Sequence, residues 1–112
     1  MRVSLSELGR TRAAAKNDDI DESGLPDSVK DLLKLIRTLK QQIAEKQQEL
    51  EALMAEPGLD PQTRRLRAES LQTALASLQG ALTAANANLL KAMREAGLGA
   101  EQMQTAANLA MR

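Results

Sequence analysis

The stretch Glu56-Pro57-Gly58-Leu59-Asp60-Pro61 decides the fold, because it is the clearest interruption in an otherwise helix-forming sequence. Gly58 can end a helix in the left-handed conformation. Asp60 is a good N-cap for a second helix, and Pro61 suits the first helical position, where its missing N–H is not needed. A connection this short makes the flanking helices antiparallel neighbours. The stretch therefore predicts a helical hairpin.

A stripe of apolar residues precedes this break, at alternating steps of three and four residues. That spacing is typical of the a and d positions of a coiled coil. Lys46 is the one polar member: either it fixes register or partner choice, or its stem lies along the seam while the ammonium reaches water, which we favour. The expected seam of this first helix, over residues 27–56, contains Val29, Leu32, Ile36, Leu39, Ile43, Leu50 and Leu53.

A second stripe follows the break and predicts a helix over residues 60–97. Two registers fit the pair of stripes. One sets Leu39 against Leu82 and Ile36 against Ala85, and the other sets Leu39 against Leu75 and Ile36 against Leu78. The large residues expected in this half of the seam are Leu71, Leu75, Leu78, Leu82 and Leu89.

The flanking segments carry weaker signals. Residues 1–26 are expected to form a flexible tail, because the acidic, turn-rich stretch at 16–26 offers little apolar area to offset its ordering entropy. Residues 98–112 are expected to be weakly helical. The predicted fold class is therefore all-α: an antiparallel two-helix coiled-coil hairpin at 27–97, with a short C-terminal helix as an option, assembling into a helical bundle.

The composition supports a narrow helix–helix seam and argues against catalysis and against metal or cofactor binding. The chain has no Phe, Tyr, Trp, Cys or His, and 15 basic residues balance 15 acidic ones. Without these residue types we expect no catalytic residues, no metal site, no cofactor and no small-molecule substrate. Zero net charge and the lack of stacking rings argue against nucleic acid as a partner.

The hydropathy pattern bears on location. No apolar run approaches the roughly 20 residues that span a bilayer, so we expect no membrane span. The first eight residues are too short and polar to form the apolar core of a secretory signal. We therefore expect a cytoplasmic protein, with export independent of a signal peptide as the alternative.

Five apolar residues lie outside the strict seam, and a two-helix hairpin cannot bury all of them. They predict a surface that contacts a partner or a second copy. The alternative is that the segment around Met103 and Leu109 folds back over them. This candidate surface contains Leu33, Leu35, Met54, Leu90 and Met93.

The hairpin resembles the FlxA-like family of bacterial coiled-coil proteins over about residues 29–90. The resemblance rests on Ile36-Arg37-Thr38-Leu39-Lys40-Gln41-Gln42-Ile43, on the break at Leu59-Asp60-Pro61-Gln62, and on Leu71-Gln72-Thr73-Ala74-Leu75-Ala76-Ser77-Leu78-Gln79. It implies a link to flagella and no biochemical activity. The chain departs from the family pattern in its Ala-rich second helix and in the segment after Gly97.

These observations favour a non-catalytic interaction or structural protein of bacteria. Its expected partners are a second copy of itself or another helical protein. Two alternatives stay open. One is a small helical chaperone or secreted component of a type III-type secretion system, and the other is a regulatory adaptor that sequesters a partner helix.

Overall fold

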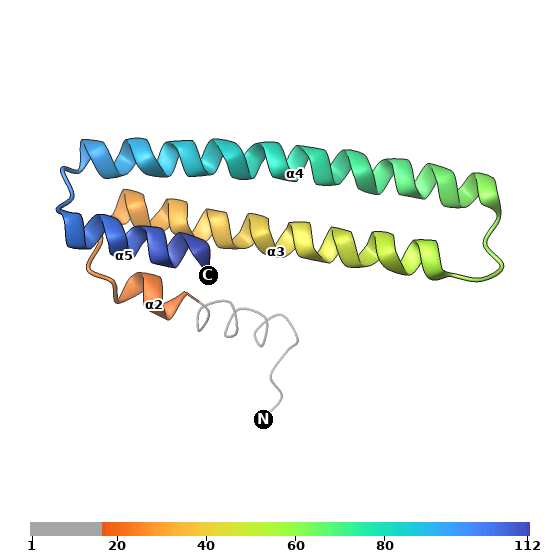
Figure 1. Ribbon diagram of the computed structural model, residues 1–112, viewed down its shortest axis with the longest axis horizontal. Coiled ribbons are helices and arrows are strands. Elements are labelled where there is room, and N and C mark those ends of the chain that lie inside the picture. The colour runs from red at the N-terminus through yellow and green to blue at the C-terminus, as the bar shows by residue number, and fades with distance from the viewer. Residues whose placement is uncertain (1–16) are drawn as a thin grey trace, which may run out of the picture. The chain divides into compact units, whose positions relative to one another are not determined.

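The computed structural model describes residues 17–112, and every regular element in that range is a helix (Figure 1). The two long helices pack against each other as a hairpin, so the predicted all-α fold class is confirmed. The prediction of a tail over residues 1–16 lies outside the described residues. The helices are α2 (Asp18–Asp21), α3 (Asp27–Ala55), α4 (Pro61–Glu95) and α5 (Ala100–Met111).

The loop between α3 and α4 adopts the conformation that its residues favour. Gly58 has a φ of 77°, in the left-handed region that few other residues adopt without strain. Asp60 caps α4: its Oδ2 accepts the backbone N–H of Thr63 at 3.1 Å, and its carbonyl accepts that of Arg64 at 2.9 Å. Arg64 also reaches back across the loop, where Nη2 donates to the Glu56 carbonyl at 2.7 Å. The turn is thus held by both its backbone and its side chains.

The C-terminal end of α4 is closed by a Schellman motif. Gly97 has a φ of 64° and donates its N–H to the Arg94 carbonyl at 3.1 Å, while Leu98 donates to the Met93 carbonyl at 3.3 Å. These two bonds satisfy carbonyls that a bare helix end would leave unpaired. They stop α4 and allow a separate helix, α5, to begin at Ala100.

The chain divides into two compact units. Unit 1 includes residues 17–34 and 89–112 of the described chain, and unit 2 includes residues 35–88. The core of unit 1 receives side chains from all four helices and from the segment after α2. Its buried apolar residues are Ile20, Leu25, Val29, Leu33, Leu89, Met93, Ala106 and Leu109.

Residues 17–26 correct the expectation of a tail that extends to residue 26. Asp18–Asp21 form the short helix α2, and both Ile20 and Leu25 are buried. The few apolar residues of this acidic segment bury too little area to order it on their own. Two of them enter a core that the neighbouring helices already form, so little further area is needed.

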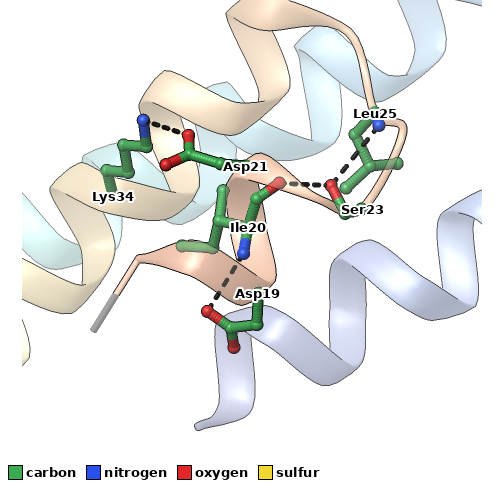
Figure 2. Close-up of polar contacts among 6 residues, drawn as sticks. All are labelled: Asp19, Ile20, Asp21, Ser23, Leu25 and Lys34. Carbon is green, nitrogen blue, oxygen red and sulfur yellow. Dashed lines mark hydrogen bonds and ion pairs between the residues drawn. The ribbon is translucent and has the colours of Figure 1, made fainter. Parts of the chain in front are cut away.

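Polar contacts hold α2 in place at several points (Figure 2). The Ser23 hydroxyl donates to the Ile20 carbonyl at 2.6 Å, and this closes the end of α2. Asp21 Oδ1 lies 2.6 Å from the Lys34 ammonium on α3. Asp19 Oδ2 accepts from Arg112 Nη1 at 3.2 Å, so residues far apart in sequence meet within unit 1.

Helix α5 is better defined than the weakly helical segment expected at 98–112. It runs for 12 residues, and Ala106 and Leu109 are buried. Met111 stays exposed over most of its surface, and Met103 over more than a third. The segment after α4 therefore helps to build the core of unit 1, as the fold-back alternative anticipated.

Candidate protein-binding face

Unit 2 has a sparsely buried core compared with unit 1. Over residues 35–88 only Ile36, Leu39, Leu53 and Ala85 are buried apolar residues. The other large seam residues of this unit keep part of their surface in solvent. They are Ile43, Leu50, Leu71, Leu75, Leu78 and Leu82.

Two open grooves lie along the α3–α4 seam of unit 2. The groove nearer the loop has a volume of about 540 Å³ and is lined by Glu49, Ala52, Leu53, Glu56, Arg67, Ser70 and Leu71. The second has a volume of about 460 Å³ and is lined by Gln42, Glu45, Lys46, Ala74, Ser77 and Leu78. We call the surface formed by these 13 residues the groove face.

The lining residues of the two grooves are related by a seven-residue step along each helix. The α3 residues at 49, 52 and 53 correspond to those at 42, 45 and 46, seven positions earlier. The α4 residues at 67, 70 and 71 correspond to those at 74, 77 and 78, seven positions later. Seven residues are two turns, so the grooves repeat on one face about 10 Å apart. The groove face is thus one continuous side of the hairpin.

The grooves also decide between the two registers that the sequence left open. Lys46 and Leu78 line one groove, and Leu53 and Leu71 line the other. Continuing the same seven-residue step places Leu39 level with Ala85, one helical turn from the register that sets it against Leu82. The rejected register would move Leu78 to Ile36, about 15 Å along the helix from Lys46.

The two helices bring different side chains to the groove face. From α3 come long polar and acidic residues, including Glu45 and Glu49, and Glu56 follows directly after the helix. From α4 come small residues at 70, 74 and 77, with Arg67 at the loop end. Leucines line both grooves between these rims. The face therefore has an apolar floor in the groove nearer the loop, a mixed floor of Leu78 and Lys46 in the second groove, one edge of long and mostly acidic side chains, and one low edge.

Lys46 behaves as the favoured sequence interpretation expects. It is half-buried, and its ammonium lies 3.2 Å from Glu49 Oε2, one turn along α3. The stem therefore runs along the seam while the charged group stays at the surface. The pair lies within the groove face, where a partner would meet both charges together.

All 12 residues predicted for the coiled-coil seam are buried or half-buried. Five are buried: Val29, Ile36, Leu39, Leu53 and Leu89. The other seven are half-buried: Leu32, Ile43, Leu50, Leu71, Leu75, Leu78 and Leu82. The half-buried members belong mainly to unit 2, which is the part with grooves.

The prediction of a partner surface is wrong for Leu33 and Met93. Both lie in the core of unit 1, at 0% and 3% exposure. The hairpin alone would leave them open, but unit 1 also contains α2 and α5. Leu35, Met54 and Leu90 are exposed, at 46%, 62% and 52%. For these three the assignment to a partner surface stays a prediction.

Some of the candidate surface was missed at the sequence level. Leu66 is 59% exposed, and it belongs neither to the predicted seam nor to the predicted partner surface. The predicted partner surface does not include the small residues of the α4 edge, Ser70, Ala74 and Ser77. Their spacing of three and four residues, at 70, 74 and 77, was the signal that could have revealed a low edge.

Two kinds of site are not found among the described residues, a cluster of metal ligands and a membrane-spanning helix. Among residues 17–112, no three Asp or Glu side chains gather in a way that could hold a metal ion. None of the helices over the same range combines the length and apolarity needed to cross a bilayer.

Comparisons with known proteins add no relative to this description. The chain matches no protein-family model, and no curated protein or solved structure is significantly similar to it.

Proposed function

We propose that this chain is a non-catalytic protein-interaction module that binds a helical partner through the groove face of unit 2. The observation that carries the proposal is the half-buried seam of that unit. Leu71 and Leu78, which line the groove face, keep part of their apolar surface in water although the helices around them are complete. A face of this kind gains stability when another helical surface covers it.

The contrast between the units supports this proposal. In unit 1, α2 and α5 supply the additional side chains that complete a buried core. Over residues 35–88 the described chain supplies only the two hairpin helices. An isolated pair of helices buries little area for its size and is marginally stable. A partner chain would supply the missing layer.

The test measures mass and thermal stability together. Light scattering at 2 and 200 µM should show a mass above the 12.1 kDa of one chain at the higher concentration. The midpoint of helix melting should rise with concentration, because association stabilises the folded form by mass action. A chain of monomer mass with the same cooperative melting midpoint at both concentrations would reject the proposal, since it would be stable without a partner.

The setting of this module is proposed on sequence grounds alone. The resemblance to the FlxA-like family supports a bacterial protein linked to flagella, and the hydropathy pattern supports a cytoplasmic location. A secretion chaperone or a helix-sequestering adaptor would use the same face for a different client. A chain that lacks cooperative melting alone at micromolar concentration, and becomes ordered when it is copurified with a client protein, would favour these alternatives.

A further inference from the structure

We propose that the partner on the groove face is a second copy of this chain, related by a two-fold axis that runs along the hairpin. This inference rests on the proposed function and specifies its partner. In this arrangement α3 of one copy lies on α4 of the other, and both loops point the same way. All neighbouring helices in unit 2 are then antiparallel, as in common four-helix bundles.

Charge favours this axis over the alternative. A two-fold axis across the helices would lay each α3 on the α3 of the other copy, so that two edges rich in Glu would face each other. Like charges that face each other at an interface are unfavourable. A rotation about the axis along the hairpin leaves the position of each residue along the helices unchanged. It sets Glu49 and Glu56 opposite Arg67 of the second copy, because all three line the groove nearer the loop.

Side-chain size favours the same arrangement. The long residues of the α3 edge, such as Gln42 and Glu45, would meet the low α4 edge of the second copy at Ala74 and Ser77. Long side chains over small ones let two helices approach and interdigitate. With the other axis, long residues would meet long ones and small residues would meet small ones, which leaves gaps.

The face is large enough for a dimer. The α3 part of unit 2, residues 35–55, is about 30 Å long, and two helices side by side are about 20 Å wide. The projected area is therefore roughly 600 Å², and the corrugated accessible area is larger. A standard interface buries about 800 Å² on each partner.

The experiment measures distances between spin labels in the whole 112-residue chain. The sequence has no Cys, so each single-Cys variant carries one label per chain. Gln62→Cys and Ala87→Cys label exposed positions near the two ends of unit 2, and neither residue lines a groove. Their separation along α4 is about 37 Å. Light scattering on each labelled variant checks that it dimerises like the unlabelled chain.

The axis along the hairpin predicts that both label pairs lie within about 30 Å, because the two copies of α4 are then diagonal neighbours at about 14 Å. A crosswise axis reverses one copy, so at least one pair must be separated by about 37 Å or more. A dimer with that longer distance would overturn this inference and leave the proposed function intact. A monomer at 200 µM with an unchanged melting midpoint would overturn both.

Discussion

Asp21 Oδ1 lies 2.6 Å from the Lys34 ammonium, and this ion pair joins the short helix α2 to the first long helix (Figure 2). The hydrogen bond to Asp21 is the main reason why the pKa of Lys34 is raised above its ordinary value. The charges of Asp21, Asp31 and Asp27 add to it, and partial desolvation opposes it. The pair therefore favours the charged lysine in the folded chain.

This raised pKa predicts a loss of α2 docking at high pH. A lysine whose folded pKa exceeds its unfolded value stabilises the fold below the unfolded value, about 10.4. That contribution disappears as the pH rises through the folded pKa. Hydrogen exchange of the amides at 18–25, normalised for intrinsic rates, should show less protection at pH 11.5 than at pH 9. Lys34→Arg should remove much of this loss, because arginine stays charged. Equal losses in both proteins would contradict the role given to Lys34.

Two neighbouring leucines should respond differently to the same substitution. Leu33 is fully buried in unit 1, while Leu35 is 46% exposed in unit 2. Leu33→Asp buries a carboxylate without a partner and should cost several kcal/mol, enough to unfold unit 1. Leu35→Asp should lower stability by less than about 1 kcal/mol. Chemical denaturation followed by helical circular dichroism measures both.

The comparison tests whether Leu33 lies in a core rather than on the surface that its sequence position predicts. Both variants add the same charge to the same helix, so differences in helix propensity cancel. Similar stability of the two variants would show that Leu33 lies at the surface, as the sequence alone suggested. A large loss confined to Leu33→Asp would place it in the core.

Gly58 and Gly80 offer a second matched pair. A Cβ added at either position meets no atom within 4 Å, so only the backbone conformation separates them. Gly58 has a φ of 77°, and Gly80 lies inside α4. Gly58→Ala should destabilise the hairpin by about 1–2 kcal/mol, because alanine is strained in the left-handed region. Gly80→Ala should stabilise it by about 0.5–1 kcal/mol. Destabilisation of equal size in both variants would contradict the turn geometry.

Much of the fold could be predicted because its signals are local. Gly58, Asp60 and Pro61 define the loop by their own conformational preferences. The three-four spacing then identifies the seam without knowledge of its surroundings. The order of residues 17–26 could not be predicted in this way. Ile20 and Leu25 are buried only because α3, α4 and α5 form a core that they can enter.

The candidate site was less predictable than the fold. Periodicity identifies which residues lie in a seam, and it does not show how deeply the seam is buried. Leu33 and Met93 follow the same sequence pattern as an open surface, yet α2 and α5 complete a core around them. The groove face depends on the register of α3 against α4. The two leucine stripes are compatible with two registers, so the sequence does not choose between them.

Arg67 should contribute to dimer affinity more than its neighbour Arg65. Arg67 lines the groove nearer the loop, where the proposed dimer sets it against Glu49 and Glu56 of the second copy. Arg65 Nε lies 3.7 Å from Glu69 on its own helix, and its side chain is 81% exposed. Arg67→Glu replaces an attraction by a repulsion at two symmetric places. Sedimentation at low salt should show dimer affinity roughly tenfold weaker.

Arg65→Glu is the control, because it makes the same change of charge on the same helix outside the groove face. Its dimer affinity should change less than threefold. The Glu49→Lys and Arg67→Glu double variant should recover part of the lost affinity, and 1 M salt should narrow the differences among all the variants, because surface charges are screened. An equal loss for Arg65→Glu and Arg67→Glu would show that only net charge matters and would remove the electrostatic argument for the axis along the hairpin.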